Sequence, residues 1–244
     1  MGLRDGGLRE SLRAQGLKQG GLRGSLRNLN STGPDIPDSD LLHTHWDASQ
    51  ISSIDPWEPE IGEVDLSPIG SPTLNTDAIN DLNTVEYDGS NDGHQADSEL
   101  NISPPINVSV AFRLITVDSS STTRLWFGNT DDHQPRAGFD SDTDDFEAGW
   151  DSDDLIGPTV SDDEKYIAQL WDDGSEAGWD VNGTEEDTKT SPDLGFSNTE
   201  FRVAQQVDDR HENVEVYEIL VYDGDPDRRD VDEYLNDKWD MGVL

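Results

Sequence analysis

Residues 34–244 carry an unusually large negative charge, which sets the conditions under which this chain can fold. The whole sequence holds 16 Lys/Arg and 54 Asp/Glu. Six of the basic and two of the acidic residues lie in residues 1–33, which leaves ten basic and 52 acidic residues, a net charge of −42, for the remainder. Low hydrophobicity with high net charge ordinarily predicts disorder. Seven Trp residues and several strand patterns indicate a folded domain instead.

A high-salt environment reconciles the acidity with a fold. At about 1 M salt the Debye length is roughly 3 Å, so the repulsion between carboxylates nearly vanishes. We therefore interpret the chain as a halophile protein, with a DNA mimic or a cation-buffering surface as the alternatives. The acidic part is not expected to bind nucleic acid, because phosphates would be repelled. No apolar run approaches the roughly 18 residues of a membrane span, so membrane insertion is not expected either.

Residues 1–33 form a basic arm in which a Leu is followed directly by a base six times. Glycine residues throughout the arm each cost roughly 1 kcal/mol in a helix interior, so only Glu10–Lys18 is expected to be helical. The repeated pairs are Leu3-Arg4, Leu8-Arg9, Leu12-Arg13, Leu17-Lys18, Leu22-Arg23 and Leu26-Arg27. We expect the Leu side chains to insert into a partner and the basic side chains to cover acidic surface. The arm is thus predicted to dock into a larger assembly, and a disordered basic tail is the alternative.

Residues 34–40 are a Pro- and Asp-containing linker, and residues 41–244 have the pattern of an all-β domain. Short strand patterns alternate with Gly/Pro/Asn/Asp clusters, which is typical of a sandwich. The predicted strands include 108–114, 124–127, 165–171, 201–207 and 214–222, of which the last is nearly continuously apolar and is predicted to be central. Asp225-Pro226 resembles an N-cap followed by Pro at N1, and residues 231–239 predict a short amphipathic helix.

Several weak motifs occur in an order that resembles a known family. They are residues 46–49 (WDAS), 85–92 (VEYDGSND), 108–114, 169–174 (QLWDDG), 181–183 (VNG), 216–223 (VYEILVYD) and 234–239 (YLNDKW). This order, over roughly residues 41–242, resembles a concanavalin A-like jelly roll of the laminin-G type. The resemblance implies two stacked antiparallel sheets that bind glycans or serve as a structural module. Together with the acidity and the arm, the whole resembles a virion protein of tailed viruses that infect haloarchaea.

Catalytic and metal sites have weak support in the sequence. The segment 142–147 (DTDDFE) is the nearest match to the Glu-x-Asp-x-x-Glu motif that glycosidases of this fold carry, but it begins with Asp, so we expect no enzyme. Asp140, Asp142 and Asp144 offer oxygen ligands for calcium, with a solvated acidic surface as the alternative. His43 and His45 would share one face of a strand, and we interpret them as a surface pair. No other cofactor is expected.

Glycan binding would use an exposed aromatic ring beside amide and carboxylate groups. Trp150 and Trp179 lie in a repeated EAGWD segment, 147–151 and 176–180, and are the candidates for such a ring; sandwich core is the alternative. Asn91, Asp92 and His94 form a second candidate group.

The sequence therefore predicts a non-enzymatic virion protein of the capsid decoration, turret or tail-fibre type at the surface of a haloarchaeal virus. Other virion proteins would bind its arm, a host surface glycan would bind its jelly roll, and the chain would form a symmetric homo-oligomer. A structural capsid cement without a ligand is a variant of this hypothesis. A cellular surface or secreted glycan-binding module of a halophile, including a glycosidase, is the alternative.

Overall fold

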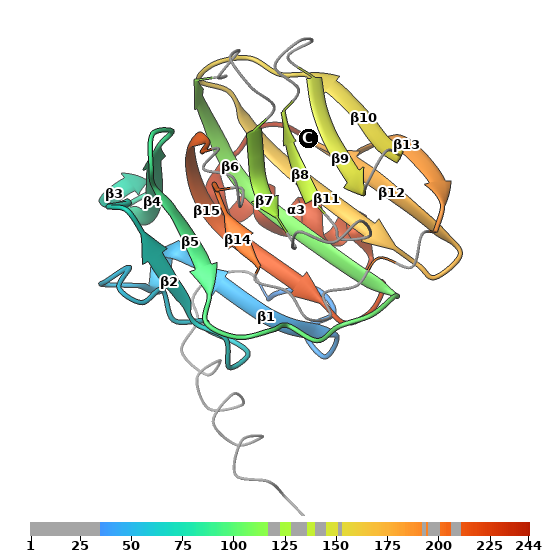
Figure 1. The fold of residues 1–244 in the computed structure, drawn as a ribbon, viewed down its shortest axis with the longest axis horizontal. Coiled ribbons are helices and arrows are strands. Elements are labelled where there is room, and N and C mark those ends of the chain that lie inside the picture. Colours follow the sequence, from blue (N-terminus) through green and yellow to red (C-terminus); the bar gives the residue numbers. More distant parts are fainter. Residues whose placement is uncertain are drawn as a thin grey trace, which may run out of the picture. The chain divides into compact units, whose positions relative to one another are not determined.

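A computed structural model describes residues 35–244, except for 117–122, 128–135, 140–144, 151–152, 192–193, 195–200 and 206–210 (Figure 1). The described strands form two antiparallel sheets. The large sheet runs in the order β13 (Thr184–Thr190), β12 (Glu176–Val181), β11 (Lys165–Asp172), β6 (Ile106–Thr116), β15 (Asn213–Tyr222), β4 (Leu82–Asp88) and β3 (Thr73–Ile79), and β1 (Leu42–Asp47) also pairs with β15. The all-β sandwich expected from the sequence is therefore confirmed.

The small sheet contains seven strands in the described part of the chain. Its order is β10 (Asp153–Thr159), β9 (Asp145–Trp150), β8 (Arg136–Phe139), β7 (Thr123–Phe127), β14 (Arg202–Val203), β5 (Gly93–Ala96) and β2 (Leu66–Ile69). A short 3-10 helix, η2 (Ala48–Gln50), follows β1. No helix among the described residues is long and apolar enough to cross a membrane.

Alternation along β6 decides which side chains enter the space between the sheets. Val108, Val110 and Phe112 are buried on one face, because successive side chains of a strand point to opposite sides. The Phe112 ring lies 6.3 Å from that of Phe139 and 5.7 Å from that of Phe146, both of the small sheet. These aromatic contacts are part of the core between the two layers.

The predicted central strand is confirmed as β15. One edge of β15 pairs with β6 over most of its length. The other edge is shared, because residues 213–216 pair with β4 and residues 218–222 pair with β1. The predicted strands 108–114, 124–127 and 165–171 fall within β6, β7 and β11.

The predicted strand 201–207 is longer than the observed one. Of the described residues in this range, only Arg202 and Val203 are in β14. Ala204, the next residue, has a left-handed backbone conformation with φ of 56°, and its N–H donates to the carbonyl of Leu125. The regular strand ends there, and residues 206–207 lie outside the described part of the chain.

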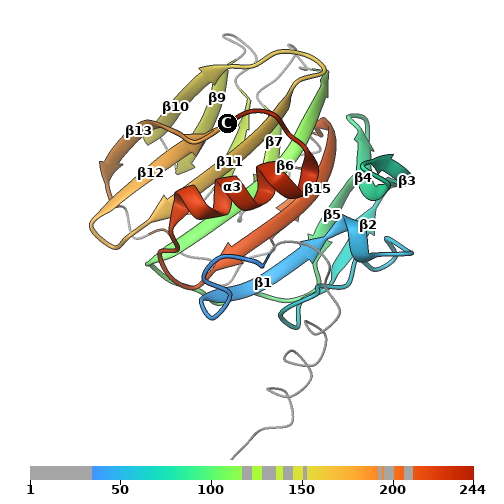
Figure 2. The ribbon, with the colours of Figure 1, turned by 180° about the vertical axis from the view of Figure 1, so that it is seen from behind.

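The predicted C-terminal helix is α3 (Arg228–Trp239), which lies across the outer face of the large sheet (Figure 2). Its N-cap is Asp227, two residues later than expected. The Asp227 carboxylate accepts hydrogen bonds from the backbone N–H groups of Arg229 and Asp230, and this satisfies two of the free donors at the helix start.

The first turn of α3 is held on the sheet by Trp171. The guanidinium of Arg228 lies 3.9 Å from the centre of the Trp171 ring system. The indole in turn covers Gly178, where an added Cβ would lie 2.1 Å from a ring carbon. A side chain at residue 178 would therefore displace the ring on which the helix rests.

Candidate functional site

Two groups of expected site residues lie outside the described part of the chain. These are the arm residues, Leu3 to Arg27, and the expected calcium ligands Asp140, Asp142 and Asp144. The docking role of the arm and the calcium site both remain predictions. Of the expected glycosidase-like segment 142–147, residues 145–147 lie in β9, where Glu147 is buried.

The two Trp residues of the repeated segment lie in different sheets. Trp150 ends β9 of the small sheet, and Trp179 lies in β12 of the large sheet; each strand is second from the edge of its own sheet. The Trp179 side chain has no exposed surface and packs 5.5 Å from the Phe146 ring. It therefore offers no face on which a sugar could stack, whereas the side chain of Trp150 lies outside the described residues.

The second group of expected glycan ligands is mostly buried. Asn91 is exposed, but Asp92 accepts a hydrogen bond of 2.7 Å from the backbone N–H of Ser71. His94 is fully buried between the hydroxyl of Tyr87, 2.8 Å from its Nδ1, and the carbonyl of Ile54, 3.1 Å from its Nε2. Burial lowers the pKa of His94 to about 4, so the ring is neutral at pH 7. Asp92 and His94 thus have structural contacts in place of free ligand groups.

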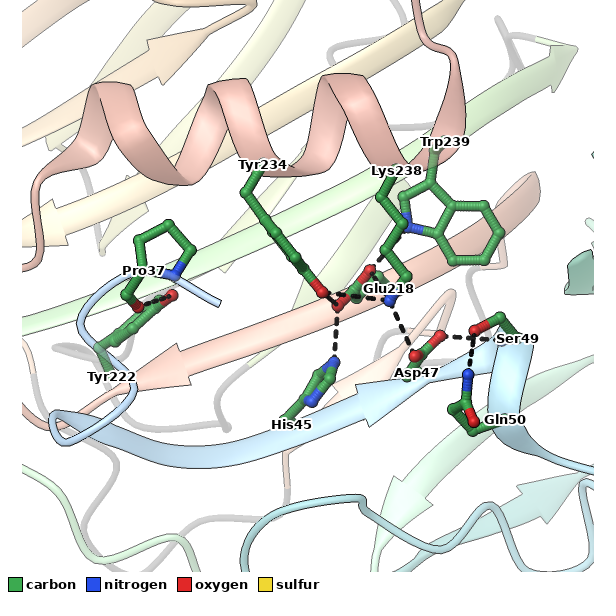
Figure 3. Close-up of polar contacts among 10 residues, drawn as sticks. All are labelled: Pro37, His45, Asp47, Ser49, Gln50, Glu218, Tyr222, Tyr234, Lys238 and Trp239. Carbon is green, nitrogen blue, oxygen red and sulfur yellow. Dashed lines mark hydrogen bonds and ion pairs between the residues drawn. The ribbon is translucent and has the colours of Figure 1, made fainter. Parts of the chain in front are cut away.

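A polar cluster that the sequence analysis did not find lies between α3 and the large sheet (Figure 3). Its centre is the Glu218 carboxylate, which has no exposed surface. We call it the Glu218 cluster, and it comprises Glu218 of β15, His45 and Asp47 of β1, and Tyr234, Lys238 and Trp239 of α3. Tyr234 and Lys238 are four positions apart and therefore lie on one helical face. Trp239 follows Lys238 at the last position of the helix and also reaches Glu218.

Each oxygen of Glu218 receives two partners. His45 Nε2 and the Tyr234 hydroxyl lie 2.6 and 2.8 Å from Oε1. Trp239 Nε1 and Lys238 Nζ each lie 2.7 Å from Oε2. Burial opposes ionisation of Glu218, but the charge of Lys238 and the hydrogen bond with His45 prevail and lower the pKa of Glu218 to about 2. The Glu218 carboxylate is therefore ionised at pH 7, and each of its two oxygens already has two partners.

The ligand atoms of His45, Asp47 and Glu218 lie within 4.8 Å of one another, which is close enough to surround a metal ion. Lys238 Nζ lies 2.8 Å from Asp47 Oδ2 and already supplies a positive charge between the two carboxylates. A metal ion would have to displace this ammonium. The expected surface pair of His43 and His45 is therefore wrong for His45, which is buried against Glu218.

Comparison with known proteins finds similar folds among solved structures. No family model and no curated protein matches the sequence. Domain 4 of a GH43 extracellular arabinanase from Geobacillus stearothermophilus, in complex with arabinotriose, is 14% identical with a TM-score of 0.61, over 80% of this chain and 98% of that one. Trypanosoma rangeli sialidase in complex with sialic acid is 11% identical with a TM-score of 0.63, over 94% of this chain but 39% of the sialidase.

A third similar structure is a chain of botulinum neurotoxin type C, a toxin whose cell entry depends on interaction with two ganglioside molecules. It is 10% identical with a TM-score of 0.60, over 81% of this chain and 51% of that one. At these identities the likeness establishes the sandwich fold. The chain spans well under two thirds of the sialidase and toxin chains that it resembles.

These comparisons correct one expectation from the sequence. The absence of an intact acidic motif led us to expect no enzyme, yet the same sandwich occurs within an arabinanase and within a sialidase. The fold is thus one that glycosidases contain, and a missing strand motif does not exclude activity.

Proposed function

We propose that residues 41–244 form a carbohydrate-recognition domain. The observation that carries the proposal is the match to the arabinotriose-bound domain of the arabinanase, which this sandwich covers over 98% of its length. The ganglioside-dependent toxin supports it from a second, unrelated source.

A glycan array tests this function. The labelled full-length chain is applied in multimolar KCl, and its circular dichroism spectrum is recorded in the same buffer to verify folding. We expect saturable binding to a restricted set of glycans, inhibited by the corresponding free sugar. A folded chain that binds no glycan on the array and no archaeal surface polysaccharide would contradict the proposal.

Glycoside hydrolysis is the second candidate function, because two of the similar structures come from glycosidases. Such a reaction commonly uses two carboxylates, about 5 Å apart in retaining enzymes and more widely spaced in inverting ones. Incubating the chain with each glycan that it binds, followed by chromatography of the products, tests this directly. Shortened oligosaccharides that increase with protein concentration would establish hydrolysis, and unchanged glycans after prolonged incubation would exclude it for those substrates.

We further propose that the chain is displayed on the surface of a haloarchaeal virion, as a symmetric homo-oligomer, with the arm docked to other virion proteins. The regular Leu–base repeat and the opposite charges of arm and body support this role. A chain lacking residues 1–33 should fold and still bind glycans but should not enter particles. Equal incorporation of the truncated chain would refute arm docking, and a chain found only on host cells would favour a cellular surface module.

A further inference from the structure

The Asn-x-Ser/Thr sequence that N-glycosylating transferases accept occurs at three places among the described residues. The asparagines are Asn101, Asn107 and Asn182, and in none of the three is the intervening residue Pro. Glycosylation attaches an oligosaccharide to the side-chain nitrogen, Nδ2, so this atom must face solvent and the fold must leave room for the sugar. The three asparagines differ in how well they meet this requirement.

Asn107 of β6 does not meet it. The residue has no exposed surface. Its Nδ2 lies 3.0 Å from Gln169 Oε1, and its Oδ1 accepts a hydrogen bond from the Ser109 hydroxyl. Gln169 in turn donates to the carbonyl of Arg228 in α3, so this network lies between the large sheet and the helix. A sugar on Asn107 would have to fit inside that layer, and Asn107 is therefore excluded.

Asn101 is exposed, in the segment that joins β5 to β6. The serine of its sequence, Ser103, is followed directly by Pro104. A proline restricts the backbone conformations of the residue before it. Since a transferase has to fit its binding site around that serine, Asn101 is the poorer substrate.

Asn182 lies at the tip of the hairpin formed by β12 and β13, at one edge of the large sheet (Figure 1). Asn182 and Gly183 are the two turn residues, and both have positive φ, 50° and 76°, as a type I′ turn requires. Gly183 and Thr184 are exposed. The Asn-Gly-Thr sequence is therefore accessible to an enzyme from solvent.

The side chain of Asn182 is held by its oxygen and leaves its nitrogen accessible. Oδ1 accepts a hydrogen bond of 2.8 Å from the backbone N–H of Ile167. Nδ2 has no hydrogen-bond partner among the described residues, and it is not one of the buried nitrogen atoms that lack a partner, so it reaches solvent. A sugar on Nδ2 leaves the side chain an amide with the same oxygen. The glycosylated residue therefore keeps its hydrogen bond with Ile167.

We propose that Asn182 is an N-glycosylation site. The sugar donor is an oligosaccharide carried on a lipid phosphate. Asn182 Nδ2 forms a bond to C1 of the oligosaccharide, the bond from C1 to the phosphate oxygen breaks with its electron pair left on the phosphate, and Nδ2 loses one proton. The Thr184 hydroxyl completes the sequence that the transferase recognises.

This inference goes beyond the proposed function, because the glycan is covalently attached to the chain in place of being bound by the sandwich. Its position has a structural consequence. Among the described strands β13 pairs only with β12, so its other edge is open. Open edges invite pairing with other chains, and a glycan at the hairpin tip would hinder such pairing.

Mass spectrometry of the full chain tests the site. The chain is produced in a halophilic archaeon, preceded by an export signal that brings it to the membrane-bound transferase. Trypsin releases residues 166–189 as one peptide, in which Asn182 is the only Asn. We expect most copies of this peptide to carry the added mass of one oligosaccharide.

Two substitutions should abolish the added mass. Asn182→Asp removes Nδ2, keeps Oδ1 and tolerates the left-handed backbone, whereas Thr184→Ala removes the recognised hydroxyl. Two matched controls should retain it. Thr184→Ser keeps a complete sequence, and Thr188→Ala changes the same strand outside that sequence.

An unmodified 166–189 peptide from the original chain would overturn the proposal. A sugar mass that persists in Asn182→Asp would also overturn it, because the sugar would then be attached to a hydroxyl. Circular dichroism in multimolar KCl verifies that each variant is folded. Binding on a glycan array is a separate measurement, so failure of this site leaves the proposed carbohydrate recognition untouched.

Discussion

Two buried carboxylates, Glu218 and Asp232, have opposite effects on the contact between α3 and the large sheet. Glu218 receives four donors and is ionised well below neutral pH. Asp232 is also buried, but its Oδ1 has no hydrogen-bond partner among the described residues. Burial, with the charge of Asp180 added, raises the pKa of Asp232 to about 7. One carboxylate therefore stabilises the helix contact at neutral pH, and the other weakens it.

Replacing Lys238 by Met should cost about 3–5 kcal/mol in the free energy of unfolding, because Glu218 and Asp47 would be left as buried charges without their cation. Denaturant titration at pH 7 measures this. Arg229→Met is the matched control, since the Arg229–Glu233 pair is exposed and is worth at most a few tenths of a kcal/mol. Equal effects of the two substitutions would show that the Glu218 cluster contributes little.

Replacing Asp232 by Asn should stabilise the protein at pH 8 by about 2 kcal/mol. The folded-state pKa of Asp232 lies above its unfolded value, so its contribution is complete below about pH 4 and is lost as the pH rises to about 7. The stabilisation by Asn should therefore shrink as the pH falls from 8 to 4. Unfolding curves across this range check the sign, and a difference that is constant with pH would exclude the titration of Asp232 as its cause.

At the scale of elements, the stability of α3 depends on the hydrogen bonds at its N-terminus as well as on its buried face. Asp227→Ala removes the carboxylate that accepts from two backbone N–H groups, and we expect a loss of about 1 kcal/mol in stability. Thermal unfolding measures the change. Asp237→Ala, on the exposed side of the same helix, serves as control, and a loss there as large as at Asp227 would indicate a general charge effect in place of capping.

Elements with their own hydrophobic pattern were predictable, and elements formed by pairing were not. Alternation identified residues 108–114, and a nearly continuous apolar run identified 214–222 as central. Thr184–Thr190 has no apolar residue, and it is a strand because β12 offers an edge with which it pairs.

The Glu218 cluster was not predicted from the sequence for a similar reason. A Glu inside an apolar strand is a visible signal, but its partners lie in β1 and α3, and only the fold brings those elements together.

The molecule as a whole is expected to require a high salt concentration in order to stay folded. At about 0.1 M salt the Debye length is about 10 Å, so the carboxylates of a body with a charge of −42 repel one another, and the chain should lose its fold. Circular dichroism during dilution from multimolar KCl measures this. Sucrose at the same osmotic pressure is the control, because it excludes itself from the surface without screening charge. A sharp thermal transition at 0.1 M salt would refute the halophile interpretation.

The shared edge of β15 has a consequence for synthesis on the ribosome. Until residues 213–222 emerge, β6 and β4 each present an unpaired edge and β1 has no partner strand in the large sheet. Open edges of this kind invite pairing with other chains. A nascent chain must therefore keep nearly its whole length soluble before its middle strand exists. We accordingly expect chaperone contact to persist until late in translation and to end as β15 and α3 are released.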